Sequence, residues 1–296
     1  MSLHLNILIT ESGGAAAVGL IKSIKKSSYN CRIYAVDCDS LAAGSVLADH
    51  SLVCPRAESD LFLSAIRDIV SLYKIDLIIP SGEHDLLKLS HEKDAFKQLG
   101  CEIFISDPHT ISICQNKLDF FNFFQNEGGL LLPLTIQTPF IKKPIKGSGS
   151  RGIEIINSRG EIVQEYIKGK EYTVDVFCDM FGNIISHVIR ERTAIKSGIS
   201  VKGKIIKKNH SISSATKRVV KLLGLKGPSC IQFKLNDDFD PVLIECNPRL
   251  GGGTYMSTLA GVNCAEIYLD LYMGKEPDPP EPKEITVVRY FEEVIL

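Results

Sequence analysis

Hydrophobic and polar residues follow two different patterns along this chain, and each predicts its own kind of sheet. In the first hundred residues, strand patterns at 6–10, 32–37 and 76–80 alternate with helical patterns near 16, at about 59–74 and after 80. Strands that alternate with helices are typical of βαβ units around a parallel sheet. Later segments alternate apolar and polar positions, which predicts strands with one buried face. We therefore expect an α/β protein.

The segment 227–253 predicts a hairpin, because two apolar runs flank the turn signal at 236–241. We place the centre of the turn between residues 238 and 239, which fixes the pairing of the two strands. One face of this hairpin is then uniformly apolar and is expected to lie against a core. Its residues are Ile231, Phe233, Leu235, Val242, Ile244 and Cys246.

The other face of the hairpin gathers oxygen-bearing side chains. Gln232 falls opposite Glu245, and strand alternation adds Leu243 and Asn247 to the same face. Amide and carboxylate oxygens are ligands that Mg²⁺ and Mn²⁺ prefer. Gln232, Glu245 and Asn247 are therefore candidate metal ligands. The alternative is a solvated polar face on which Lys234 pairs with Glu245.

The residues after the hairpin favour a binding site over a solvated turn. Pro248 ends the strand, and Arg249 places a planar guanidinium group, which is always charged, beside the carboxylate of Glu245. The glycines 251–253 allow backbone to approach a ligand closely.

A second candidate for phosphate binding lies between residues 140 and 156. Lys143 ends a predicted strand, and a run of small residues follows it, with N–H groups that can surround phosphate oxygens. This run is not a Walker A loop, because it lacks a terminal Gly-Lys-Ser/Thr and a strand follows it. A linker is the alternative interpretation. The residues of the run are Gly147, Ser148, Gly149, Ser150, Arg151 and Gly152.

The chain between residues 162 and 208 offers further polar candidates. A predicted strand at 163–167 runs into a bend, and a second strand places Glu171, Thr173 and Asp175 on one face. The cationic run that follows is either a solvated loop or a site where Arg190, Arg192 or Lys204 meets a substrate carboxylate or a phosphate.

Composition limits the partners of the protein. The chain has 296 residues, 44% of them hydrophobic, which is enough for two or three compact lobes. A net charge of −1 and a pI near 6.7 give no electrostatic case for nucleic acid or an anionic membrane. Nine cysteines without a C-x-x-C pair favour reduced thiols, and no apolar run approaches membrane-spanning length. We expect a cytoplasmic protein with small-molecule partners.

The ends of the N-terminal strands carry polar residues. A glycine-rich turn at 11–14 and an acid at Asp37 suggest dinucleotide binding, but the G-x-G-x-x-G pattern is missing, so close packing is favoured. Ligands of such sheets lie outside the carboxyl ends of the strands. Each polar residue there, taken alone, is more easily interpreted as a turn or capping residue. The candidates are Glu11, Asp37, Ser81, Gly82 and Glu83.

The order of Gln232 and then Glu245-Cys246-Asn247-Pro248-Arg249 resembles the metal motif of the ATP-grasp superfamily, and the chain is similar to either half of the carbamoyl phosphate synthase large subunit. This resemblance implies that Gln232, Glu245 and Asn247 hold metal ions that bridge ATP phosphates. It implies that Arg249 steadies the transferring phosphoryl group.

The resemblance also implies an ATP site. Lys143 matches the lysine before the glycine loop that covers the triphosphate, and Lys117 matches another lysine that reaches phosphate. The backbone from Glu165 to Ile167 would meet the adenine edge, and Glu171 would accept the ribose hydroxyls. The residues implied in cofactor binding are Lys117, Lys143, Gly147, Ser148, Gly149, Ser150, Arg151, Gly152, Gln164, Glu165, Tyr166, Ile167, Glu171, Arg190, Gln232 and Glu245.

The expected architecture is a Rossmann-like domain at 1–110 followed by an ATP-grasp domain at 111–296. The latter divides into a small lid lobe at about 111–165 and a C-terminal lobe at 166–296 that holds the metal hairpin. The lid is shortened, because the chain around Lys143 and Gln164 leaves too little length for the helix that is customary there. A single unit is present, so complete carbamoyl phosphate synthesis is not expected.

The function implied is an ATP-dependent ligase that joins a carboxylate to an amine or ammonia through an acyl phosphate. Its cofactors would be ATP with Mg²⁺ or Mn²⁺, and Lys143 and Arg249 would be catalytic. The first alternative is an ATP-binding partner subunit, or a nucleotide-binding protein with little turnover. The second is an NAD-dependent enzyme. A homodimer or a partner subunit is possible.

Overall fold

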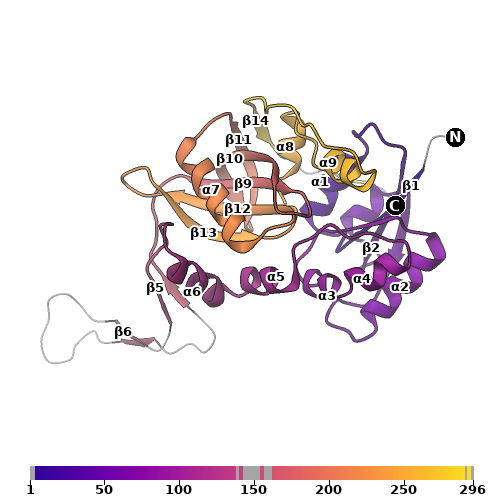
Figure 1. Cartoon of the computed structure of the whole chain (residues 1–296), viewed down its shortest axis with the longest axis horizontal. Helices are drawn as coiled ribbons and strands as arrows, with labels where there is room; N and C mark the ends of the chain where they lie inside the picture. The colour runs from indigo at the N-terminus through magenta and orange to yellow at the C-terminus, as the bar shows by residue number, and fades with distance from the viewer. Residues whose placement is uncertain (1–3, 138–139, 143–153, 157–161, 291, 295–296) are drawn as a thin grey trace, which may run out of the picture.

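The computed structural model describes residues 4–137, 140–142, 154–156, 162–290 and 292–294. Its elements form a parallel sheet near the N-terminus, a larger antiparallel sheet toward the C-terminus, and a thin extension of short strands that projects from the side of the molecule where α6 and β13 lie (Figure 1).

The N-terminal sheet is parallel, as predicted, and its four strands lie in the order β3-β2-β1-β4. In register, Ile7 lies beside Ile33 on one side and Leu77 on the other. The sequence pattern missed β3, because this edge strand is mostly exposed and half polar. The strands are β1 (Leu5–Thr10), β2 (Cys31–Asp37), β3 (His50–Val53) and β4 (Leu77–Pro80).

Helices cover both faces of this sheet. Gly19 lets one of them approach the C-terminal part closely, since a Cβ atom there would lie 3.1 Å from Cβ of Tyr255. A short 3₁₀ helix, η1 (Ala43–Val46), precedes β3. The α-helices of the first 127 residues, the last of which packs on the antiparallel sheet, are α1 (Ala15–Ile24), α2 (Phe62–Tyr73), α3 (Leu86–His91), α4 (Lys93–Gln98), α5 (Pro108–Gln115) and α6 (Lys117–Glu127).

The C-terminal sheet is antiparallel, with the order β13-β12-β9-β10-β11-β14. Its strands are β9 (Glu171–Cys178), β10 (Ile184–Lys196), β11 (Ile199–Ile206), β12 (Gly227–Leu235), β13 (Pro241–Asn247) and β14 (Thr286–Val288). The helices of this part are α7 (His210–Leu223), α8 (Tyr255–Leu259) and α9 (Cys264–Tyr272).

Three hydrophobic clusters hold these elements together. One cluster lies under α2 and α3 on the parallel sheet. A second joins α6 and α7 to one face of the antiparallel sheet. The third joins α1 and α9 and includes Phe177, Val188 and Ile205 from the other face of that sheet. The two sheets are therefore connected by a shared core.

The predicted hairpin is β12 and β13, with a turn and a bulge that the sequence did not reveal. Near the turn, Phe233 pairs with Leu243, so the turn is centred one half-residue earlier than predicted. A β-bulge at Ile244 then restores the predicted pairing of Gln232 with Glu245. Leu243 consequently lies in the core with Phe233 and not on the polar face. Val242 pairs with Lys234 but is buried, as predicted, whereas Ile244 is only half-buried, so its assignment to the core face was wrong.

The extension consists of two antiparallel pairs, β5 with β8 and β6 with β7. Among the described residues between 128 and 164, no helix is present, and the short lid stays a prediction. The strands are β5 (Thr135–Gln137), β6 (Phe140–Lys142), β7 (Glu154–Ile156) and β8 (Ile162–Gln164).

Candidate functional site

A cleft of about 420 Å³ lies where the N-terminal domain, α5 and α6, β8 and the antiparallel sheet meet. It brings together residues that are distant in sequence, and nine of its lining side chains were candidates from the sequence alone. These lining residues are Glu83, Lys117, Gln164, Arg190, Arg192, Gln232, Glu245, Asn247 and Arg249.

The three candidate metal ligands meet on the polar side of β12 and β13. Glu245 Oε1 accepts hydrogen bonds from Gln232 Nε2 at 2.6 Å and from Asn247 Nδ2 at 2.9 Å. The two amides therefore converge on one carboxylate, which is half-buried at the cleft wall. Among the described residues there is no cluster of three or more His, Cys, Asp or Glu side chains that could hold a metal. Any metal here would be bound by one carboxylate and two amides.

This donor set fits a hard divalent cation such as Mg²⁺, which takes oxygen ligands and commonly uses only one or two carboxylates. In the structure, Gln232 and Asn247 direct their N–H groups at Glu245. To bind a cation, each amide would have to present its oxygen to the ion, because only the oxygen of an amide can act as a ligand.

Arg192 supports this set from the neighbouring strands. Its Nη1 donates to Gln232 Oε1 at 2.9 Å and is also paired with Glu171. Its Nε donates to Ser200 Oγ at 3.2 Å, and its Nη2 to the carbonyl of Gly198. Every nitrogen of this guanidinium is thus engaged within the protein.

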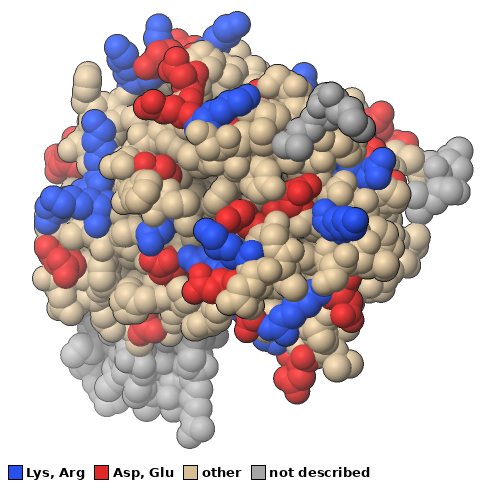
Figure 2. Space-filling view, turned by 45° about the vertical axis from the view of Figure 1, so that its right-hand side comes forward, with Lys and Arg blue, Asp and Glu red and all other residues tan. Residues whose placement is uncertain are grey.

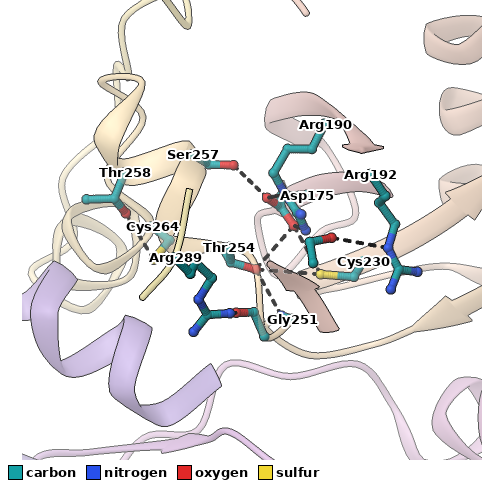
Figure 3. A network of polar contacts seen from close by, with 12 residues as sticks. Asp175, Arg190, Arg192, Cys230, Gly251, Thr254, Ser257, Thr258, Cys264 and Arg289 are labelled. Atoms are coloured by element: carbon teal, nitrogen blue, oxygen red, sulfur yellow. Dashed lines mark hydrogen bonds and ion pairs between the residues drawn. The ribbon is translucent and has the colours of Figure 1, made fainter. Parts of the chain in front are cut away.

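Asp175 and Arg190 form a buried ion pair beside the cleft (Figure 3). Arg190 Nε and Nη2 donate to the two carboxylate oxygens of Asp175 at 2.6 and 2.8 Å. Ser257 Oγ donates to Asp175 Oδ2 at 2.5 Å, and Thr254 Oγ1 donates to Oδ1 at 3.1 Å. The side chains of the pair are 1% and 3% exposed, so this carboxylate ties β9 and β10 to the start of α8.

The charges of the pair determine the protonation of its members. Burial acts to raise the pKa of Asp175, but the Arg190 charge and the hydrogen bonds outweigh it, so the pKa is lowered. Burial acts to lower the pKa of Arg190, yet Asp175 raises it overall. Burial and the neighbouring Asp175 charge raise the pKa of the Cys230 thiol to about 12. Both members of the ion pair therefore stay charged, and the thiol stays neutral.

The glycines after the hairpin fit closely around these arginines. A Cβ atom at Gly253 would lie 2.5 Å from Arg190 Nη1, so only glycine leaves room for the guanidinium there. Arg289 Nη1 donates to the carbonyl of Gly252 at 2.6 Å. The loop 251–253 thus contacts two arginines and lines the cleft together with Arg190.

Arg249 lies at the border with the N-terminal domain. Its Nη2 is 2.6 Å from Glu83 Oε1, and its Nη1 donates to the carbonyl of Leu250 at 2.9 Å. Its Nε is buried and has no partner among the described residues. Gln115 Nε2 donates to the carbonyl of Glu83 at 2.6 Å, so helix α5 fixes the loop that carries Glu83.

Several predicted residues lie outside the lining of this cleft. Tyr166 is 77% exposed, and Glu165 binds the backbone N–H of Leu134 through its carboxylate at 3.1 Å. The carbonyl of Ile167 accepts from Lys234 Nζ at 3.0 Å, and Glu171 is paired with Arg192. Their contacts with adenine and ribose stay predictions.

Lys204, the third candidate of the cationic run, is exposed on β11 and also lies outside the lining. The phosphate-loop prediction falls outside the described residues. It comprises Lys143, Gly147, Ser148, Gly149, Ser150, Arg151 and Gly152.

The N-terminal candidates have mainly structural contacts. Glu11 Oε1 accepts from the backbone N–H groups of His84 and Asp85 at 2.8 and 3.0 Å. Asp37 accepts from the N–H of Gly13 at 2.8 Å. Sequence reasoning assigned no role to Thr254, Ser257 or Arg289, because their contacts with the site depend on strand order and loop packing.

The chain matches known families and proteins over most of its length. Residues 7–104 match the family "PylC-like, N-terminal domain", and residues 158–294 match "ATP-grasp in the biosynthetic pathway with Ter operon". It is 32% identical over 255 residues to a carbamoyl phosphate synthase large chain of Agathobacter rectalis, covering 71% of this chain and 23% of that protein. A D-alanine–D-alanine ligase of Petrotoga mobilis is 32% identical over 100 residues, covering 26% of this chain and 33% of that protein.

Solved structures agree on the fold. The biotin carboxylase domain of Hydrogenobacter thermophilus 2-oxoglutarate carboxylase, solved with MgADP, ADP and bicarbonate, has a TM-score of 0.64 at 16% identity. The match covers 92% of this chain and 70% of that chain.

These matches identify the chain as an ATP-grasp protein with a mixed α/β fold and a parallel N-terminal sheet. More particularly, it resembles one half of the carbamoyl phosphate synthase large chain. The chain spans about a quarter to a third of the length of the two sequence relatives named above, one of which is a ligase.

Surface charge and helix length add little to this assignment. Lys and Arg side chains are interspersed with Asp and Glu on the face shown in Figure 2, without a broad patch of one sign. No helix in the described part of the chain is both long and apolar enough to span a bilayer. The nine cysteines, all within the described residues, are free thiols.

Proposed function

We propose that this chain is an ATP-dependent ligase that joins a carboxylate to an amine or ammonia through an acyl phosphate. The observation that carries the proposal is the convergence of Gln232, Glu245, Asn247 and Arg249 in one cleft. A carboxylate flanked by two amides suits a Mg²⁺ or Mn²⁺ ion, and an arginine fork suits a phosphoryl group. ATP is the cofactor, and the lining side chain of Lys117 is a candidate phosphate ligand.

A divalent cation at Glu245 would neutralise charge on the phosphate oxygens of the nucleotide. Phosphoryl transfer depends mainly on such charge neutralisation and on positioning. Arg249 is the group we assign to the transferring phosphoryl, because it lies at the cleft border and its Nε has no partner among the described residues.

Arg190 is the most suitable carboxylate ligand among the three cations considered. Arg192 uses all its nitrogens within the protein, and Lys204 lies outside the cleft lining. Arg190 has two nitrogens on Asp175, while its Nη1 lies against Gly253 at the cleft. Held this rigidly, it would bind an anion with little loss of side-chain entropy.

The reaction has two balanced steps. A carboxylate oxygen attacks the γ-phosphorus, and the bond to the bridging oxygen breaks so that ADP leaves with that electron pair. The amine nitrogen then attacks the acyl carbon, the C–O bond to phosphate breaks, and the nitrogen gives up a proton. Both steps require that the reactants be held in contact, and phosphoryl transfer also requires the attacking and leaving oxygens to be roughly in line.

Hydroxylamine trapping tests this proposal directly. The protein is incubated with Mg·ATP, hydroxylamine and, one at a time, bicarbonate or each common amino acid, and hydroxamate and ADP are measured. We expect hydroxamate and ADP in equal amounts with at least one carboxylate. Tight ATP binding without hydroxamate from any of them would refute ligase activity and favour a nucleotide-binding partner protein.

A further inference from the structure

The acidic groups of the cleft are few. Among the described lining residues, the carboxylates belong to Glu83 and Glu245, and none of these residues is a histidine. Glu245 already accepts hydrogen bonds from Gln232 and Asn247 and is the proposed metal ligand. Glu83 is therefore the remaining carboxylate that faces the reacting groups.

Glu83 lies next to the proposed phosphoryl ligand. Its Oε1 is 2.6 Å from Arg249 Nη2, while Oε2 makes no hydrogen bond to the described residues. The side chain is 50% exposed, so a small solute can reach it. The loop that carries it follows β4, at the carboxyl end of the parallel sheet, where ligands of open α/β sheets bind.

The loop is fixed in place from both sides. The carboxylate of Glu11 accepts from the N–H groups of His84 and Asp85, and Gln115 holds the carbonyl of Glu83. The Glu83 carboxylate is thus presented by a supported loop, as a group that acts on a substrate requires.

The second step of the proposed reaction needs such a carboxylate. As the C–N bond forms, the nitrogen becomes positively charged and must release a proton before or while phosphate leaves. A general base within hydrogen-bond reach typically accelerates such a step by about 10²- to 10⁴-fold. The cations at this end of the cleft, Arg190 and Arg249, cannot accept a proton.

We propose that Glu83 receives the amine: its carboxylate accepts hydrogen bonds from the incoming N–H groups and takes the proton released when nitrogen attacks the acyl phosphate. Its place beside Arg249 puts that proton acceptor next to the departing phosphate. This inference rests on the proposed ligase function and names the chemistry of its second substrate, an amine or ammonia whose N–H groups face a carboxylate.

A comparison of two nucleophiles distinguishes a general base at Glu83 from a residue that only positions Arg249. Hydroxylamine attacks acyl phosphates without enzymatic help, whereas ammonia in buffered ammonium chloride depends on a base in the site. Wild type and Glu83→Gln are compared for hydroxamate formation and, by mass spectrometry, for incorporation of isotope-labelled ammonium, with the carboxylate panel described above. Glu127→Gln, an exposed residue at the far end of α6, is the matched control.

We expect Glu83→Gln to keep hydroxamate formation within about twofold of wild type and to lose ammonium incorporation by about 10²-fold or more. Glu127→Gln should change neither. Equal loss of both products would mean that Glu83 acts only by positioning the Arg249 side chain. Unchanged ammonium incorporation would mean that the Glu83 carboxylate is not needed. Either result overturns the inference. Wild type that forms no hydroxamate would instead refute the ligase function on which the inference depends.

Discussion

The buried pair of Asp175 and Arg190 gives the sharpest stability prediction. In Asp175→Asn, the Arg190 charge stays buried, with its side chain 3% exposed and without its counterion. Breaking a buried ion pair by removing one partner costs about 3–5 kcal/mol. Ser257 and Thr254 also lose the ionised acceptor of their hydrogen bonds. Since domains are stable by about 5–15 kcal/mol, this loss should be evident at once.

Urea unfolding at neutral pH, followed by circular dichroism, measures this loss. Asp68→Asn on the exposed side of α2 is the matched control and should change the free energy of unfolding by less than about 0.5 kcal/mol. The double variant Asp175→Leu/Arg190→Met should be less destabilised than the sum of its single variants, because it leaves no unpaired buried charge.

The pH dependence has a defined sign. The folded pKa of Asp175 is lowered, so its contribution to stability is present above the unfolded pKa of about 3.9 and is lost as pH falls toward the folded value. A loss below about 1 kcal/mol in Asp175→Asn, or strict additivity in the double variant, would refute the view that this pair holds the site together.

Two further predictions concern Arg249 and Asp85. Arg249→Lys should raise the barrier of phosphoryl transfer by about 2 kcal/mol and leave ATP affinity nearly unchanged, because it replaces a planar guanidinium group by a point charge. Steady-state kinetics would measure kcat and calorimetry would measure ATP affinity; lost affinity at constant kcat would contradict this role. Burial and the charge of Glu11 raise the pKa of Asp85 to about 8, so the folded state holds a proton that the unfolded state releases near pH 4. Stability should therefore fall between about pH 4 and 8, by at most about 1.4 kcal/mol per unit. Urea midpoints that show the same slope in Asp85→Asn would exclude this residue as the cause.

The local patterns in the sequence predicted much of the fold. The alternation of apolar and polar residues predicted the faces of β9, where Tyr172, Val174 and Val176 enter the core. It also predicted that Gln232 pairs with Glu245, although for a partly wrong reason. The shifted turn centre and the bulge at Ile244 displace the strand register in opposite directions, so their effects cancel at Gln232 and Glu245. The pattern of apolar and polar residues along a single strand contains no signal for either feature.

Long-range contacts of the site could not be predicted in this way. The order of the strands places β9 between β12 and β10, which is why Arg192 reaches both Glu171 and Gln232. The pairing of Glu83 with Arg249 joins residues 166 positions apart. Such pairs depend on how the two sheets pack, and periodicity along the chain does not encode that packing.

The central claim is that Glu245, with Gln232 and Asn247, holds the metal of a metal–ATP complex, and calorimetric titration with ATP tests it most directly. We predict that ATP binds in Mg²⁺ and much more weakly in EDTA. Glu245→Gln should weaken binding in Mg²⁺ at least tenfold, or about 1.4 kcal/mol, without changing the urea midpoint. Equal ATP affinity in Mg²⁺ and in EDTA, for both wild type and Glu245→Gln, would contradict the account.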